Sequence, residues 1–166
     1  NDGDNDLIDS AWNVIDNNLV TKVYQNEPLG TYVELPVDGL HAVAYGDIDA
    51  VDIDHDGDLD ISISGVDSVS NFATRVHSLS GKVYKNEGSF NFTELLDIPG
   101  ARILRFADLN GDLKPDIISK GTTDLEDPQS SFTDVYLNDT NFSNSPPDAP
   151  TSLTSFAVST RAIFTW

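Results

Sequence analysis

Short apolar runs separated by polar turns fill most of the chain. Apolar positions gather at residues 40–51 and 103–107, and again at 61–64 and 117–119. Runs of this length, bounded by turn residues, are typical of β-strands. No stretch keeps a 3.6-residue period, although residues 8–19 can be misread as one or two turns of helix. The pattern therefore predicts an all-β protein. Glycines stand between the runs, as turn residues should, at Gly39, Gly65, Gly81, Gly88, Gly100 and Gly121.

An Asp-rich string occurs three times along the chain. The full copy is DIDHDGDLDI at residues 52–61, the second is DLNGDLKPDI at 108–117, and NDGDNDL at 1–7 matches the end of a third. The last Asp of each copy falls at residues 6, 60 and 116, so the spacings are 54 and 56 residues. Regular spacing of this kind indicates a repeated structural unit.

A second signature, Val-Tyr-x-Asn, accompanies each copy. It stands at residues 23–26, 83–86 and 135–138, so the unit is about 55 residues long. In each unit, strands are predicted before and after the Asp string, at the Val-Tyr segment, and at 32–35 or 92–95. We expect Val and Tyr to pack in the strand and Asn to occupy the following turn. A four-stranded sheet repeated at this period is typical of a β-propeller blade.

The combination of an apolar strand, the string D-x-[DN]-x-D-G-x-x-D-[IL] and a later Tyr-x-Asn resembles the VCBS or FG-GAP repeats of bacterial surface proteins. These repeats are related to the calcium-bearing blades of integrin α-subunit propellers. The resemblance covers about residues 1–142 and implies blades at 1–37, 38–96 and 97–142. It implies a partial ring of about two and three-quarter four-stranded blades.

A propeller usually needs four to eight blades, so three arrangements stay open: a segment of a larger ring, several chains that complete one another, or an open array. The end of the chain differs from the repeats. Residues 143–150 are rich in proline and predict a linker. Residues 151–166 resemble the opening strands of a fibronectin type III domain, cut short at Trp166. We therefore expect the chain to be a segment of a larger multidomain protein.

The charge of the chain is strongly negative, with 28 acidic side chains against 9 basic ones and a net charge of −19. Nucleic acid and anionic membrane surfaces are therefore not expected partners. The acids are 23 Asp and 5 Glu, a ratio that favours turns and sites for hard cations over helices. The absence of cysteine excludes disulfides and zinc-thiolate sites. No apolar run is long enough to span a bilayer, so membrane insertion is not expected.

Carboxylates crowded into one short loop repel one another, so each Asp string predicts a bound cation. Alternate positions 1, 3 and 5 can direct oxygens at one centre, position 7 offers a carbonyl, and position 9 supplies a closing carboxylate. So many hard oxygens favour Ca²⁺ over Mg²⁺. The predicted ligands of the full copy are Asp52, Asp54, Asp56, the carbonyl of Asp58, and Asp60. Those of the second copy are Asp108, Asn110, Asp112, the carbonyl of Lys114, and Asp116.

Two full sites are thus predicted, with a third partial site at Asp2, the carbonyl of Asp4, and Asp6. The second copy carries one fewer negative charge and has Leu113 where the full copy has Gly57, so we expect a weaker or slightly displaced site. The alternative interpretation of the loops is a set of solvated acidic turns without metal. An EF-hand does not fit, because its position 12 needs a Glu and is Ile63 in the full copy.

Asp47 and Asp49 precede the full copy and have two interpretations, as extra ligands or, as we prefer, as polar positions on the exposed face of a strand. The three histidines, at 41, 55 and 77, lie in no pattern of a catalytic base or metal pair. We therefore expect no catalysis by this chain.

The resemblance implies a calcium-stabilised, non-catalytic repeat module of a secreted or cell-surface bacterial protein, with a role in adhesion or in binding carbohydrate or protein. The alternative is the propeller portion of an extracellular polysaccharide-degrading enzyme, a lyase or a glycosidase. Expected partners also include other blades of the parent chain, or further copies that complete the ring.

Overall fold

The computed structural model describes residues 5–27, 30–71, 76–123, 130–139, 157–158 and 161–162. Within these residues the protein is all-β, without an α-helix, as the sequence predicts. The strands form three small antiparallel sheets. A separate two-residue pairing joins β11 (Ala157–Val158) to β12 (Arg161–Ala162). The rest of the proposed linker and fibronectin segment lies outside the described residues.

The first sheet has the order β1-β2-β3, with β1 at Leu7–Asn13, β2 at Asn18–Glu27 and β3 at Thr31–Leu35. Residues 8–19 are therefore a hairpin and not a helix. In its turn, the side-chain oxygen of Asn13 accepts hydrogen bonds from the N–H groups of Ile15 and Asp16. Asn17 adopts a left-handed φ of 56°, a conformation that Asn tolerates better than most residues.

The second sheet has the order β4-β5-β6-β7, with bounds at Ala44–Val51, Asp60–Asn71, Val76–Asn86 and Phe92–Pro99. The third sheet has the order β8-β9-β10, with bounds at Ala101–Ala107, Asp116–Thr122 and Ser131–Tyr136. The four-stranded unit predicted from the sequence is thus complete in the second sheet. The other two sheets have three strands within the described part of the chain.

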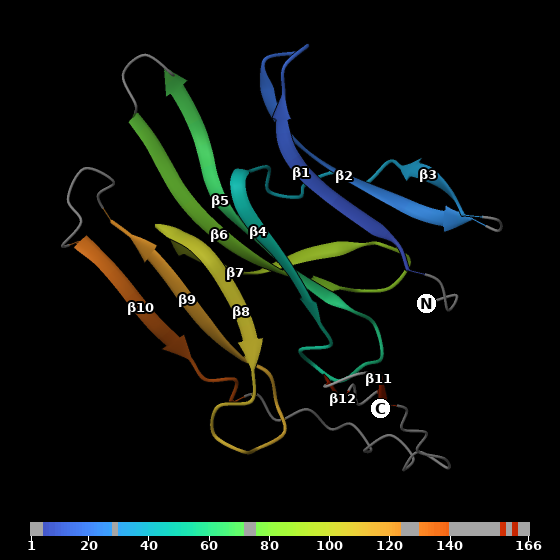
Figure 1. The fold of residues 1–166 in the computed structure, drawn as a ribbon, viewed down its shortest axis with the longest axis vertical. Coiled ribbons are helices and arrows are strands. Elements are labelled where there is room, and N and C mark those ends of the chain that lie inside the picture. The colour runs from blue at the N-terminus through green and yellow to red at the C-terminus, as the bar shows by residue number, and fades with distance from the viewer. Residues whose placement is uncertain are drawn as a thin grey trace.

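The three sheets follow one another in space, with β1 beside β4 and with β8 against β4, β5 and β6 (Figure 1). The same kind of contact recurs at both junctions. Ser10 of β1 donates its hydroxyl to the carbonyl of Val43 (2.9 Å), and Ser64 of β5 donates to the carbonyl of Arg102 (3.1 Å). Both serines stand four residues after the last Asp of their copy. The second sheet therefore packs on the third much as the first packs on the second.

Each junction between sheets contains its own apolar core. The core between the first and second sheets consists of Val43, Ile61, Ile63 and Tyr84, with Ile8, Leu40, Ile48 and Phe92 packed against them. The core between the second and third sheets consists of Ile53, Val83, Ile98, Ala101, Leu104 and Ile117, with Val51, Leu96 and Phe106. The described residues form no closed ring or barrel.

Candidate metal centre

The loop at 52–60 connects β4 to β5 and brings three of its carboxylates together. Asp52, Asp54 and Asp60 each offer an oxygen within 4.8 Å of the other two. Asp52 is held in place by the loop backbone, because its two oxygens accept N–H bonds from Asp56 and Gly57, both at 3.0 Å. The loop therefore turns around its first carboxylate, and the closing Asp returns to it as the sequence predicts.

Asp60 is fully buried and connects two elements. One carboxylate oxygen accepts the N–H of Ile53 at 2.7 Å, and the other accepts the N–H of Asn86 at 2.8 Å. Burial raises the pKa of Asp60, and the two backbone donors act in the opposite direction. Asp60 thus closes the loop and fastens it to the end of β6.

The loop at 108–116, between β8 and β9, repeats this arrangement. Position 1 accepts the N–H of position 6, position 3 that of position 5, and position 5 that of position 7. Asp116 accepts the N–H groups of Leu109 (2.9 Å) and Asn138 (2.8 Å), as Asp60 accepts those of Ile53 and Asn86. The equivalent sequence positions of the two copies therefore have equivalent structural roles.

The backbone also repeats, although the glycines do not. Positions 4 and 6 are left-handed in both loops, with φ of 59° at His55 and 95° at Gly57, and 81° at Gly111 and 68° at Leu113. A glycine avoids the steric cost of the left-handed conformation at position 6 of loop 52–60 and at position 4 of loop 108–116. The two loops therefore make the same turn, each with one glycine and one left-handed non-glycine residue, His55 or Leu113.

Backbone donors affect the ionisation of the second loop. Desolvation acts to raise the pKa of Asp108, but the backbone N–H groups of the loop, first those of Gly111 (2.7 Å) and Leu113 (2.9 Å), together outweigh it and lower the pKa. In the described residues, the 52–54–60 triad is the only group of three or more His, Asp or Glu side chains close enough to share one ion. Loop 108–116 has Asn110 in place of the second carboxylate of that triad.

The partial copy is described only from Asn5 onward. Asp6 accepts the N–H of Asn26 at 3.0 Å, the same bond that Asp60 and Asp116 make to Asn86 and Asn138. Asp2 and Asp4, the other predicted ligands of this copy, lie outside the described residues.

Sequence reasoning missed Lys85, which lies at loop 52–60. Its Nζ is 2.7 Å from an oxygen of Asp54 and 3.5 Å from oxygens of Asp56 and Glu87. The hydrogen bond to Asp54 raises the pKa of Lys85, so the side chain stays charged. Lys85 occupies the variable position of Val-Tyr-x-Asn. The regular spacing of that signature from the Asp string is the sequence feature that could have placed Lys85 near the loop. In loop 108–116, the nearest described ammonium is that of Lys114, 4.0 Å from Asp112.

The Asn of the Val-Tyr-x-Asn signature is not confined to the predicted turn, because Asn26 lies inside β2 and Asn86 is the last residue of β6. Its backbone N–H binds the closing Asp of its own unit, as described above. The side chain of Asn138 also donates to the carbonyl of Ile53 at 3.0 Å, which joins the third sheet to the loop of the second. The side chain of Asn86 instead donates to the carbonyl of Leu59, in its own unit, at 3.3 Å. The two signatures of each unit therefore meet in one hydrogen-bonded network.

Asp47 and Asp49 lie on β4 and face the third sheet. Asp47 forms an ion pair with Arg105 of β8, and Asp49 accepts the N–H of Phe106 at 3.4 Å. Both side chains are partly buried. The preferred interpretation, polar positions on an exposed strand face, is therefore incomplete, because these residues connect two sheets.

The donor set of loop 52–60 consists of oxygen atoms alone, which suits a hard cation. Each carboxylate oxygen has two lone pairs, so an oxygen that accepts one N–H can still coordinate an ion. The triad of Asp52, Asp54 and Asp60 could therefore hold a metal ion. No helix in the described part of the chain has the length and apolar character to cross a membrane. Comparison with protein-family models, curated proteins and solved structures gave no match for this chain.

Proposed function

We propose that this chain is a calcium-stabilised, non-catalytic β-repeat module of a secreted or cell-surface bacterial protein, with a role in binding carbohydrate or protein. One observation carries the proposal: two loops 56 residues apart hold their acidic side chains in the same hydrogen-bonded arrangement, each at the end of an equivalent strand. Acidic turns that were merely solvated would have no need of a shared geometry.

Electrostatic repulsion supports a bound cation. Two unit charges 4.8 Å apart repel by about 3.5 kcal/mol at an effective dielectric of 20, and the triad of loop 52–60 contains three such pairs. Lys85 neutralises one carboxylate of the triad directly, at Asp54. A divalent ion among the oxygens removes the remaining repulsion, so metal binding becomes part of the free energy of folding.

Calcium is the proposed ion because the predicted shell contains many oxygen donors, a flexible set that suits Ca²⁺ better than the strict octahedron of Mg²⁺. Calcium sites in extracellular modules bind with Kd of about 10⁻⁴ to 10⁻³ M, so they are filled at the calcium concentrations found outside the cytosol. The resemblance to VCBS or FG-GAP repeats supports the same compartment. It also supports blade-like sheets and a binding role.

The first test is thermal unfolding with and without calcium. At about 10 mM Ca²⁺, each site with this range of Kd should stabilise the fold by about 1.4 to 2.7 kcal/mol, with a corresponding rise in Tm. A chelator should reverse the rise. A Tm that responds neither to calcium nor to chelator would overturn the metal proposal.

A matched pair of variants locates the effect. Asp52→Asn removes a charge from the triad and keeps an acceptor for one of the two loop N–H groups that Asp52 binds, so it should weaken the calcium-induced rise in Tm. Asp134→Asn makes the same change at an exposed position of β10 and should leave the rise unchanged. Equal losses in both variants would indicate diffuse binding to a negative surface.

A further inference from the structure

Ile53 lies between two carboxylates of the metal triad, Asp52 and Asp54, and is fixed by contacts from two different sheets. Its N–H donates to Asp60, the closing carboxylate of its own loop, at 2.7 Å. Its carbonyl accepts the side-chain N–H of Asn138, which follows β10 of the third sheet, at 3.0 Å. Its side chain is 5% exposed and packs in the core between the second and third sheets. The third sheet therefore helps to position the backbone that carries two carboxylates of the triad.

Asn138 is itself held by the other Asp loop. Its backbone N–H donates at 2.8 Å to Asp116, the closing carboxylate of loop 108–116, and the other oxygen of Asp116 accepts an N–H inside that loop. The side chain of Asn138 then binds the carbonyl of Ile53, whose N–H binds Asp60. A continuous series of hydrogen bonds therefore joins the closing carboxylates of the two loops.

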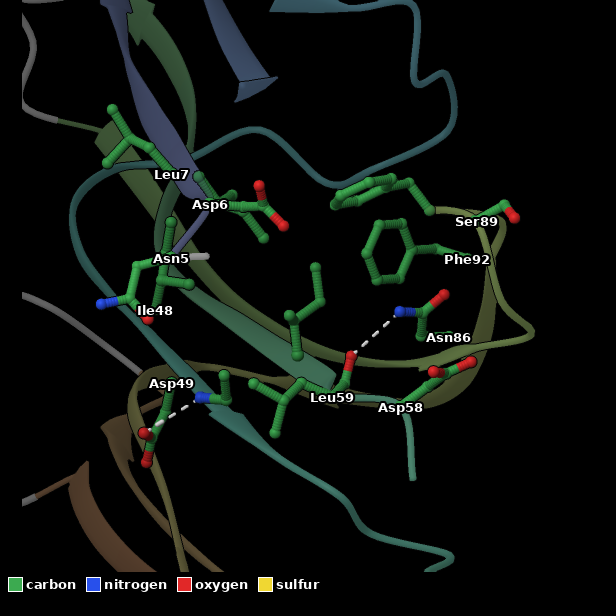
Figure 2. Close-up of a pocket in the computed structure, with 14 residues that line it drawn as sticks. Asn5, Asp6, Leu7, Ile48, Asp49, Asp58, Leu59, Asn86, Ser89 and Phe92 are labelled. Carbon is green, nitrogen blue, oxygen red and sulfur yellow. Dashed lines mark hydrogen bonds between the residues drawn. The ribbon is translucent and has the colours of Figure 1, made fainter. Parts of the chain in front are cut away.

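The equivalent residue of the second sheet, Asn86, makes no such connection between loops. Its backbone N–H binds the closing carboxylate of its own unit, Asp60, at 2.8 Å. Its side chain donates to the carbonyl of Leu59 in the loop of that same unit (Figure 2). Asn138 thus connects one Asp loop to another, whereas Asn86 acts within a single unit.

We propose that Asn138 couples the two Asp loops, so that an ion bound in loop 108–116 strengthens the binding of an ion in loop 52–60. An ion in loop 108–116 fixes its ligand Asp116 and, through it, Asn138. The bond from Asn138 to the carbonyl of Ile53 then costs less conformational entropy, and the backbone beside that carbonyl is held in place for its own ion. Because coupling between two binding sites is reciprocal, each ion strengthens the binding of the other by the same factor. The inference rests on the proposed function and deepens it, because it states how the two metal sites are regulated.

The test follows calcium binding in each loop separately, by NMR of the ¹⁵N-labelled full chain. The amide resonances of Gly57 and Gly111 report the two loops, because each N–H donates to the first carboxylate of its own loop, Asp52 or Asp108. Calcium titrations of these two resonances therefore give one affinity for each loop.

Disabling loop 108–116 shows whether the loops are coupled. Asp112→Ala removes a predicted ligand of that loop and should weaken the calcium binding that Gly57 reports. In a chain that also carries Asn138→Ala, this effect should be smaller by about two- to tenfold, the factor that one hydrogen bond between uncharged groups contributes to an equilibrium constant. An equal effect of Asp112→Ala in the two chains, or no effect in either, would overturn the inference.

Charge also acts between the loops, because an ion in one loop changes the electric potential at the other. The titrations are therefore made in about 0.15 M salt, where the screening length is about 8 Å. The charge effect that remains is the same with and without the uncharged side chain of Asn138. The comparison of the two chains therefore measures the hydrogen bond and not the charge.

Asn86→Ala is the matched control for Asn138→Ala. It removes the same side chain from the same position of the signature, but the bond that it removes lies within one unit. Whatever it does to the affinity of loop 52–60, it should leave the effect of Asp112→Ala on that loop unchanged. An equal loss of coupling in Asn86→Ala would reject Asn138 as the connecting residue. If Asn138→Ala does not fold, Asn138→Ser, whose hydroxyl is held on a shorter side chain, should show the same loss of coupling.

Hydrogen exchange in chelator separates this outcome from that of the proposed function. Without metal, Asn138→Ala should still make the amide of Ile53 exchange at least about twofold faster. A chain that binds calcium independently in its two loops keeps the metal proposal and loses the coupling. A chain without a calcium response at Gly57 or Gly111 loses the metal proposal. Faster exchange of Ile53 would then still support the connection through Asn138, and unchanged exchange would reject it.

Discussion

At the scale of single residues, each Asp loop has two left-handed positions, 4 and 6, and a glycine at only one of them. In loop 108–116 the glycine is at position 4, and Leu113 takes a φ of 68° at position 6. A left-handed conformation costs an L-residue about 1 to 2 kcal/mol, and Leu113 is 80% exposed, so packing offsets little of that cost. The backbone at position 6 of this loop is therefore strained, because the turn requires a left-handed conformation there.

Leu113→Gly should relieve this strain. Part of the gain is lost to the greater entropy of glycine in the unfolded chain, about 0.4 to 1 kcal/mol, so the free energy of unfolding should rise by about 0.5 to 1 kcal/mol. Urea denaturation measures the change. Gly111→Ala is the control, because an added Cβ meets nothing within 4 Å there and only the backbone conformation suffers. It should destabilise the protein by about 1 kcal/mol, and stabilisation by Gly111→Ala would contradict the strain argument.

Lys85 provides loop 52–60 with an internal counter-charge that competes with a bound ion. Lys85→Gln should lower the Tm without calcium, because Asp54 loses the ammonium 2.7 Å away. It should also raise the affinity for calcium about three- to tenfold, since no positive charge remains beside the ion. Calorimetric titration measures the affinity.

Lys82→Gln provides the matched control for Lys85. Lys82 lies on the same strand, but it pairs with Glu94 (2.7 Å) and Asp97 (3.7 Å) and not with the loop. Its loss should leave calcium affinity unchanged. A fall in affinity in Lys85→Gln would mean that the ammonium supports the site rather than competing with it.

At the scale of elements, the sequence predicts the strands better than the connections between them. Short apolar runs identify the strands on both sides of each Asp loop, but three of the glycines predicted as turn residues, Gly65, Gly81 and Gly121, lie inside β5, β6 and β9. The connections depend on residues distant in sequence: the pair of Asp47 with Arg105, and the bond of Asn138 to Ile53, 85 residues earlier. Such contacts follow from the stacking of sheets, which no local pattern records.

The closing Asp of each loop likewise has one role that the sequence predicts and one that it does not. Its place in the repeat predicts a metal ligand, whereas its two bonds to backbone N–H groups appear only when the loop and the Val-Tyr-x-Asn strand are seen together. Asp116→Ala should therefore leave the N–H groups of Leu109 and Asn138 without their acceptor and destabilise the protein by about 2 to 4 kcal/mol, even without calcium. Chemical denaturation in chelator measures this loss.

The control for Asp116→Ala is Asp112→Ala. Asp112 is exposed and accepts one N–H bond within the loop, from Lys114 at 3.0 Å. Its replacement should cost about 1 kcal/mol or less in chelator. If the two variants lost equal stability without calcium, the closing Asp would not be a structural clamp in addition to a ligand.

At the scale of the whole molecule, the negative charge is unevenly distributed. Of 23 Asp, eight lie in the two described loops, five in loop 52–60 and three in loop 108–116. One divalent ion in each loop would change the net charge from −19 to −15. Eight of the 28 acidic side chains thus lie within two nine-residue loops at the ends of β4 and β8, where their repulsion opposes folding unless it is neutralised or screened.

Salt should therefore stabilise the protein when calcium is absent. Raising sodium chloride from about 0.01 M to about 1 M shortens the screening length from about 30 Å to about 3 Å and weakens the repulsion within the loops. Screening of exposed ion pairs such as Lys22–Glu34 costs little stability, because these pairs contribute little to the free energy of unfolding at any salt concentration. The Tm in chelator should rise with salt, and the rise should shrink when calcium is bound.

Variants of equal charge test where the repulsion lies. A protein with both Asp52→Asn and Asp108→Asn should lose much of the salt-induced rise in Tm, since one charge leaves each crowded loop. Asp9→Asn with Asp134→Asn removes the same two charges from exposed strand positions and should lose little of it. Similar losses in the two proteins would mean that salt acts on the overall charge of −19 rather than on the loops, and that the loops hold their carboxylates without appreciable strain.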